Sequence, residues 1–153
     1  MTLPVPSLAH VFDVEVALGA LEDHGATRAG HRRVIPIVGG RITGALEAEI
    51  LPGGADWQIV RSDGSIEIDG RYSARTTAGE LLYLQANGVR SGEPAVLEAL
   101  LRGEAVDPAD YYFRTVVTIE TSAERLATYQ RALFLAVAER GADVVRYATY
   151  RFA

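Results

Sequence analysis

Apolar and polar residues alternate along most of the chain, and this period of two predicts β-strands, whose successive side chains point to opposite faces. The alternation is plainest in Ser7–Gly19. Further strands are predicted where the same pattern is bounded by turn residues such as Gly-Gly, Pro-Gly and Asp-Gly. These strands are Arg33–Val38, Ile42–Leu51, Trp57–Arg61, Ser65–Thr77, Leu81–Val89, Tyr111–Ile119 and Val144–Phe152.

Two segments in the second half of the chain favour helices. Glu93–Leu101 has helical periodicity and is followed by Gly103, a common helix stop. Thr121 and Glu124 fit the capping box T-x-x-E, so a short helix is expected to start there and to run toward Gln130. The helical content of the chain is therefore expected to be small.

The remaining segments complete the prediction of the fold class. Asp23–Gly30 has the residues of a loop, and Ala132–Val137 either prolongs the preceding helix or forms another strand. Many short strands, spaced by about 8–12 residues and separated by glycine-rich turns, are typical of a barrel or a sandwich. No repeat or linker divides the chain, so we predict one all-β domain over residues 1–153.

Composition excludes several classes of protein. Of the 153 residues, 48% are apolar and 23% charged, and the net charge of −5 is spread along the chain, so no basic surface for nucleic acid is present. No apolar run approaches the roughly 20 residues of a membrane helix. The chain begins without the pattern of a signal peptide, so we expect a cytoplasmic protein. The absence of cysteine and three scattered histidines give no metal site, and no motif indicates a cofactor.

The segment Ser65–Thr77 poses the functional question. Read as a strand, it has one apolar face, which includes Ile66, Ile68 and Tyr72. Its opposite face is polar and consists of Glu67, Asp69, Arg71, Ser73, Arg75 and Thr77. This polar face is either solvated surface or the lining of a pocket, and periodicity alone leaves both orientations open.

Four strings of residues resemble the DUF3237 (UPF0311) family, in the order in which the family has them. They are PIVGGR at Pro36–Arg41, PGGADWQIVRSDG at Pro52–Gly64, DGRYSARTTAGELLYLQANGVRSG at Asp69–Gly92 and YYFRTVVTIET at Tyr111–Thr121. The resemblance implies a closed antiparallel β-barrel of about eight strands, similar to allene oxide cyclase-like and lipocalin-like barrels. The chain departs from the family pattern at Thr128–Gln130, where relatives tend to have Trp-Leu-Asn, so substrate preference does not carry over.

The resemblance also bears on the polar strand faces, because Asp69, Arg71 and Arg75 fall within the motif positions. Tyr111–Thr121 and Leu81–Val89 divide into a polar and an apolar face in the same way. If these polar faces point inward, the lumen holds arginines and carboxylates that must be partly paired, since buried charges are tolerated only when they are compensated. The opposite orientation leaves the charges in water.

The inward orientation leads to a hypothesis about chemistry, that of a cofactor-independent isomerase, cyclase or lyase of a small anionic, aromatic or polyketide-like molecule. Arg71, Arg75 and Arg114 would stabilise an anion, Tyr83 and Tyr112 would donate protons, and Glu120 or Asp56 would act as general base. The residues expected to contact the substrate are Trp57, Asp69, Gln85, Asn87 and Thr118. A barrel that binds and carries a small molecule without converting it is the alternative, and a barrel packed shut is a third possibility.

Assembly is predicted from the outer strand faces. Their β-branched and aromatic residues would be exposed in a chain with few helices, which favours a homodimer, the commonest symmetric assembly. No nucleic-acid or membrane partner is expected.

Overall fold

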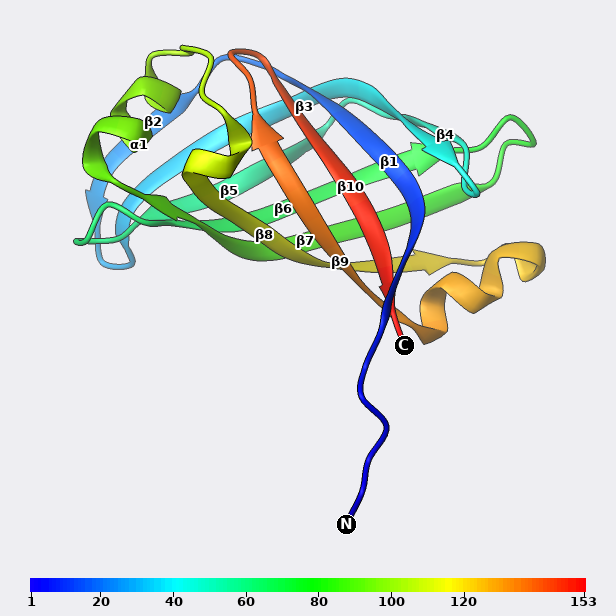
Figure 1. Ribbon diagram of the computed structural model, residues 1–153. Coiled ribbons are helices and arrows are strands. Elements are labelled where there is room, and N and C mark those ends of the chain that lie inside the picture. Colours follow the sequence, from blue (N-terminus) through cyan, green and yellow to red (C-terminus); the bar gives the residue numbers. More distant parts are fainter.

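The computed structural model describes residues 1–153 as ten β-strands with one α-helix and two 3₁₀ helices (Figure 1). The strands are β1 Leu8–Leu18, β2 Glu22–Thr27, β3 Gly30–Gly44, β4 Ala48–Ile50, β5 Gly54–Val60, β6 Ile66–Arg75, β7 Leu81–Gly92, β8 Tyr111–Thr121, β9 Leu133–Arg140 and β10 Val144–Phe152. The helices are α1 Pro94–Leu101, η1 Pro108–Asp110 and η2 Glu124–Arg131.

The strands form one closed antiparallel barrel in which sequence neighbours are also neighbours in space. Going round the wall, β10 follows β1, and β9, β8, β7 and β6 come next. The two short strands β4 and β5 together bridge β6 to β3, and β3 pairs with β1 to close the barrel. Because β2 extends β1 along the same edge of β3, the wall has eight positions. The predicted barrel of about eight strands is confirmed.

Three local expectations change once backbone pairing is known. Asp23–Gly30, expected as a loop, contains most of β2, because its polar residues pair with the backbone of β3. Ala132–Val137 belongs to a strand, since β9 lies between β8 and β10 and both neighbours satisfy its backbone groups. Ile42–Leu51 is divided by a turn into the end of β3 and β4.

The two predicted helices form, with one change at the second. α1 begins at Pro94, whose missing amide hydrogen costs nothing in the first turn, and it buries Leu97 and Leu100. The predicted capping box is not made, because the Thr121 hydroxyl accepts from the Ala123 amide and the segment continues as the 3₁₀ helix η2.

The interior of the barrel has two unlike halves. The half toward η2 is mainly apolar, with Phe12 packed on Phe134 and on Tyr129, whose ring is stacked on Phe134 at 5.9 Å. Leu126 of η2 is buried in the same cluster. The departure from the family pattern at Thr128–Gln130 thus lies in the helix that packs against this half. The half toward α1 contains polar side chains.

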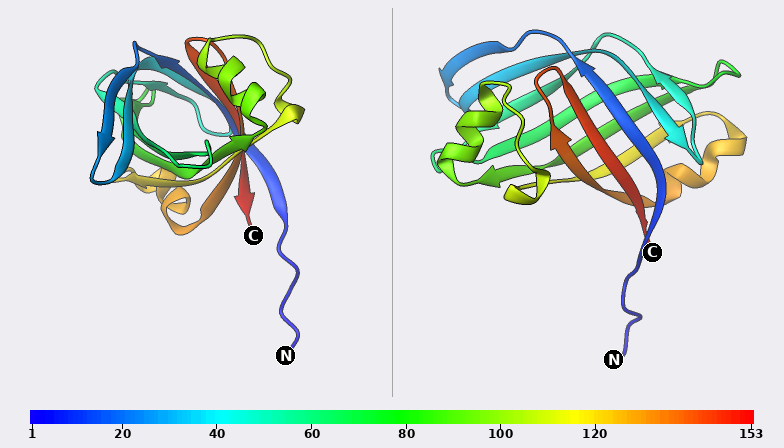
Figure 2. Two further views of the ribbon diagram at one scale, coloured as in Figure 1. Left: turned by 90° about the vertical axis from the view of Figure 1, so that its left-hand side faces the viewer. Right: turned by 45° about the horizontal axis from the view of Figure 1, so that its top comes forward.

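The ends of the chain meet on the wall. The amide of Ser7 donates to the carbonyl oxygen of Ala153 at 2.7 Å, and the reverse bond is 3.0 Å long. Residues before Ser7 extend away from the barrel (Figures 1 and 2). No helix is long and apolar enough to cross a membrane.

Candidate functional site

The polar face of β6 lies on the outside of the barrel, which corrects the inward orientation considered above. Arg71 and Arg75 are exposed, whereas Ile66, Ile68 and Tyr72 are buried inside. The physical reason is hydration. The barrel interior is filled by side chains, and burying the apolar face removes it from water while the guanidinium groups keep their water shell. The two arginines are therefore surface residues.

Four of the predicted residues do come together, but on the outer surface across β6 and β7. Arg71 donates from Nε and Nη2 to the carboxylate of Asp69, at 3.1 Å each. Asn87 Nδ2 donates to the same carboxylate at 3.1 Å, and Gln85 Nε2 lies 3.5 Å from it. Partial burial opposes ionisation of Asp69, but the hydrogen bond and charge of Arg71 outweigh it and lower the pKa. This cluster is a satisfied surface network.

The other predicted residues, Asp56 excepted, also face outward. The Arg114 guanidinium lies 5.2 Å from the ring centroid of the exposed Tyr112 and donates to the carbonyl oxygen of Phe113 at 3.0 Å. Trp57 is 45% exposed on the outside of β5. The remaining members lie on the outer faces of β6, β7 and β8, and they are Glu67, Tyr83, Thr118 and Glu120. None of them lines the lumen.

Five long polar or charged side chains occupy the lumen instead, in the half toward α1, where the smaller Thr115 also lines it. They come from β3, β5, β7 and β9 and are Arg33, Asp56, Gln58, Arg90 and Arg140. All but Arg33 line a cavity of about 50 Å³. The rest of its wall is mainly apolar, with Ile35 and Ile37 from β3, Ile68 from β6 and Phe113 from β8. The cavity has room for a few water molecules or for the charged group of a small ligand.

The charges of the lumen are unbalanced. Three guanidinium groups face one carboxylate, and none of the chain's ion pairs includes any of these four side chains. The Nε atoms of Arg33 and Arg90 and the Oε1 atom of Gln58 are buried and have no hydrogen-bond partner. Buried polar atoms are satisfied in nearly all native structures, and two of these unpartnered atoms, on Gln58 and Arg90, belong to residues that line the cavity, which indicates a missing polar partner there.

Asp56 is the one predicted residue that reaches this site. Its carboxylate accepts from Gln58 Nε2 at 2.8 Å and from the amide of Asp69 at 3.0 Å. Burial raises the pKa of Asp56, and these hydrogen bonds and the charge of Arg90 offset only part of the shift. A carboxylate with a raised pKa accepts a proton more readily than an ordinary aspartate does, as a general base must.

Arg90 is the most deeply buried of the three arginines, with 2% of its surface exposed. Burial, and then the like charge of Arg140, lower its pKa to about 10, so the group stays cationic at neutral pH. Its guanidinium lies 5.4 Å from the ring centroid of Phe113, and this cation–π contact offsets part of the lost hydration. Arg140 differs, because its Nη1 donates to the carbonyl oxygens of Gly141 and Ala142 at 2.5 and 3.1 Å.

Two tyrosines separate the cavity from the apolar half of the barrel. The hydroxyls of Tyr72 on β6 and Tyr147 on β10 are hydrogen-bonded to each other, and both residues line the cavity. Burial raises the pKa of Tyr72 above its ordinary value, so the phenol stays protonated. A phenol in this position can donate a hydrogen bond to an oxygen of a bound molecule.

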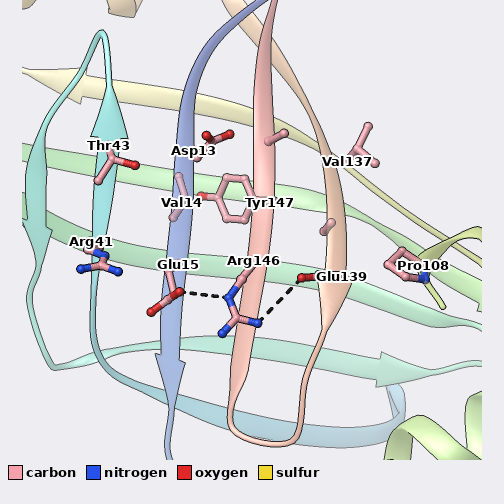
Figure 3. A pocket seen from close by; sticks show the side chains of 12 residues that line it. Asp13, Val14, Glu15, Arg41, Thr43, Pro108, Val137, Glu139, Arg146 and Tyr147 are labelled. Carbon is pink, nitrogen blue, oxygen red and sulfur yellow. Dashed lines mark hydrogen bonds and ion pairs between the residues drawn. The ribbon is translucent and has the colours of Figure 1, made fainter. Parts of the chain in front are cut away.

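A second hollow, of about 440 Å³, lies on the outer wall over β1, β3, β9 and β10 (Figure 3). Four of its charged residues alternate in sign across four paired strands, in the order Arg41, Glu15, Arg146 and Glu139. The bond from Arg146 Nε to Glu15 is 3.0 Å long, and the contact of Nη1 with Glu139 is 3.8 Å. These groups are about half exposed, so the ladder supports strand pairing weakly, by about 0–1 kcal/mol per pair. No buried polar atom of this ladder lacks a hydrogen-bond partner, so the lumen remains the candidate site.

The lumenal arginines could have been found from the sequence by strand parity. Arg33 is in phase with Ile35 and Ile37, so it lies on an apolar strand face. Arg90 follows Leu82, Leu84 and Ala86 in the same phase, one residue beyond the predicted end of that strand, and Arg140 follows Phe134, Ala136 and Ala138 in the same way. A charged residue on the apolar face of a strand is the signal that was missed.

Fold and site together define the class of this protein, a closed antiparallel β-barrel with an arginine-rich, largely desolvated lumen. The profile of the family described as "Protein of unknown function (DUF3237)" matches residues 6–152. The chain belongs to this family, as its motifs predicted. The UPF0311 protein blr7842 of Bradyrhizobium diazoefficiens is 39% identical over 142 residues, which cover 93% of each chain.

Solved structures show the same barrel. The crystal structure of the conserved protein of unknown function RPA1785 from Rhodopseudomonas palustris has a TM-score of 0.93 and 33% identity, with 99% of this chain and all of that chain covered. An enzyme from Penicillium herquei has a TM-score of 0.72 at 16% identity, over 100% and 99% of the two chains. At that identity the likeness shows a shared fold alone.

Proposed function

We propose that the barrel binds a small organic anion in its lumen and transfers a proton within it, without a cofactor. The observation that carries this proposal is the charge imbalance of the lumen, where Arg90 and Arg140 line the cavity with one carboxylate, Arg33 lies outside its wall, and the buried Nε of Arg90 lacks an acceptor. A carboxylate, enolate or phenolate would supply the missing acceptor and the missing negative charge. The cavity of about 50 Å³ holds the charged group alone, so a hydrocarbon or aromatic body would displace apolar wall residues such as Ile35, Ile68 and Phe113 and pack against them.

The proton transfer would use Asp56 as the base. The carboxylate takes a proton from a carbon next to a carbonyl group, the C–H electron pair forms a C=C bond, and the carbonyl π electrons move to oxygen. The enolate oxygen accepts hydrogen bonds from Arg90 or from the Tyr72 phenol, and the proton then returns to another carbon or to oxygen. The molecule regains the proton that it lost, at a different atom, and the net result is an isomerisation. The raised pKa of Asp56 supports its role in both directions of this transfer.

Binding without turnover is the second candidate, and one observation favours it. Both oxygens of Asp56 already accept a hydrogen bond, from Gln58 and from the Asp69 amide, as they would in a residue that only holds the wall together. A carrier barrel would need the arginines for affinity and would leave Asp56 outside the chemistry. The two functions share the anion site and differ in what Asp56 does.

The anion site is tested by thermal unfolding with benzoate, 4-hydroxybenzoate and neutral benzamide at millimolar concentration. Ligands that bind only the folded state raise its stability by mass action. We expect the carboxylates, and not benzamide, to raise the unfolding temperature. Arg90→Met should abolish this shift while the free protein stays as stable or becomes more stable, because an unpaired buried charge is removed.

Arg71→Met is the matched control, since it removes an arginine from the outer face of the adjacent strand. It should keep the full carboxylate shift. Equal stabilisation by benzamide and benzoate, or a shift that survives Arg90→Met, would contradict the anion site.

The chemistry is tested with phenylpyruvate, an aromatic 2-oxo acid, in D₂O. Proton transfer predicts that the protein accelerates deuterium incorporation at the carbon next to the carbonyl group, as followed by NMR. Asp56→Asn should abolish the acceleration while the thermal shift caused by benzoate persists. If the unsubstituted protein binds carboxylates but causes no exchange in a panel of oxo acids, the carrier function holds instead.

A further inference from the structure

The outer wall of the barrel carries an apolar surface that nothing in the chain covers. Six large apolar side chains on β1, β8, β9 and β10 are each between 39% and 53% exposed, and we call them the outer apolar patch. They are Leu8, Tyr112, Val116, Leu133, Val137 and Phe152. Contiguous exposed patches of this kind mark interaction sites in soluble proteins.

The patch is continuous because its members are paired across strands. Leu8 lies opposite Phe152, which in turn lies opposite Leu133. Val116 lies opposite Leu135, which is only half-buried, and a groove of about 580 Å³ runs along these strands. The one charged side chain in the groove is Arg114, and it is stacked on Tyr112. Few charges therefore oppose the pairing of two copies of this surface.

A second apolar element, the segment Met1–Pro6, begins at the edge of the patch. It runs away from the barrel beside the first residue of β1 (Figure 1), and Leu3 and Val5 are 71% and 90% exposed. A polar tail would be stable in this position. Alternating leucine and valine in water indicate that the segment, called the arm below, has a binding surface elsewhere.

The arm is built to reach outward and not to fold back. Pro4 and Pro6 fix their own backbone and restrict Leu3 and Val5 to extended conformations. Both backbone groups of Ser7 are bonded to Ala153, which fixes the direction in which the arm leaves the wall. At about 3.1 Å per residue the arm spans about 19 Å, or roughly four strands of a sheet. It therefore reaches across a neighbouring patch more readily than it reverses onto its own.

We propose that two copies of this chain pair through their outer apolar patches and exchange arms, so that the arm of each copy lies on the patch of the other. The closed barrel leaves only short edges free, such as that of the six-residue strand β2, so side-chain packing between wall faces is the main way to associate. Two-fold symmetry uses the same patch and arm on both copies, so every contact is made twice. The arms add apolar contact area and tie the two barrels together.

The oligomeric state is tested by analytical ultracentrifugation of the full chain. We expect a dimer at micromolar concentration, and Val116→Asp should weaken it at least about tenfold, because two carboxylates would be buried in the symmetric contact. Val38→Asp is the matched control, since Val38 is 52% exposed, against 39% for Val116, but lies on β3, outside the patch. A chain that stays monomeric at about 100 μM, or a Val38→Asp variant as dissociated as Val116→Asp, would overturn the proposal.

Arm exchange is tested separately, and the absence of cysteine makes the chain a clean background for it. One preparation carries Leu3→Cys alone and another carries Val116→Cys alone, and the two are mixed under mild oxidation. Exchange predicts a disulfide-linked heterodimer in the mixture and weaker dimerisation when residues 1–6 are removed. If a chain carrying both substitutions forms only an internal disulfide as a monomer, the arm covers its own barrel and the proposal is wrong.

Discussion

Arg75 and Arg90 show how far the surroundings of one residue type differ within this wall. Arg75 lies on the outer face of β6 in water, whereas Arg90 is buried beside Phe113 on the inner face of β7. An exposed arginine keeps its hydration and costs nothing, but a buried one without a partner is held at the expense of stability. A protein that retains such a residue uses it for something other than folding, and for Arg90 we propose anion binding.

The raised pKa of Asp56 makes the stability of the folded state depend on pH. Its folded pKa is raised from the ordinary value of 3.8 by burial. The folded state therefore binds the Asp56 proton more tightly than the unfolded chain. The contribution of this proton to stability is fully present below the unfolded pKa and is lost as the pH rises through the folded pKa.

Asp56→Asn removes this titration and so isolates it from that of the other carboxyl groups. The unfolding temperature of the variant minus that of the unsubstituted protein should rise as the pH increases from about 3 to about 8. Geometry permits the change, because the Gln58 amide can turn so that its unpartnered Oε1 accepts from the new amide. A difference that is flat or falls with pH would show that the pKa of Asp56 is not raised.

At the scale of elements, β7 and β8 approach each other closely at one glycine. A Cβ on Gly88 would lie 1.9 Å from the carbonyl oxygen of Arg114 and 2.7 Å from the Cα of Thr115. Both atoms are backbone, so the two strands would have to separate. Gly70 on β6 differs, because a Cβ there would meet Ala86 at 3.7 Å, an ordinary contact.

These two glycines make a matched pair of substitutions. Gly88→Ala should lower the free energy of unfolding by about 1–3 kcal/mol, the usual cost of overpacking. Gly70→Ala should change it by less than about 0.5 kcal/mol, since neither backbone strain nor a clash is introduced. Urea denaturation measures both. Equal effects would mean that strand separation at Gly88 is not what limits substitution.

At the scale of the whole molecule, the wall separates two functions that its strands carry on opposite faces. On β8, Phe113 and Thr115 line the lumen while Tyr112 and Val116 form part of the outer apolar patch. Successive side chains of a strand point to opposite faces, so each face can change without moving the other. The proposed anion site and the proposed dimer contact should therefore be independent.

This independence predicts the behaviour of two variants. Val116→Asp should be monomeric and still gain the full thermal shift from benzoate, whereas Arg90→Met should lose the shift and still dimerise. Ultracentrifugation and thermal unfolding on the same samples check both statements. Loss of benzoate binding in a folded monomer would mean that the lumen depends on the second copy.

Most of the wall was predictable because it depends on local properties. The period of two and the glycine turns identified strands that correspond to eight of the ten, since a strand needs only alternating side chains and a way to reverse direction. β2 was missed because its polar residues carry no apolar period, and only hydrogen bonds with β3 hold it in place. β9 stayed ambiguous until its two neighbours were known.

The sequence by itself determined which residues share a face of each strand, and with the family motifs it determined the closed barrel. Which face is inside was decided by the tertiary structure, because closure selects the orientation that buries the most apolar surface at the lowest cost in desolvated charge. The same closure brought Arg33, Asp56, Arg90 and Arg140 together from four strands. Their meeting depends on which strands lie across the lumen from one another, a property of the whole barrel that no single strand contains.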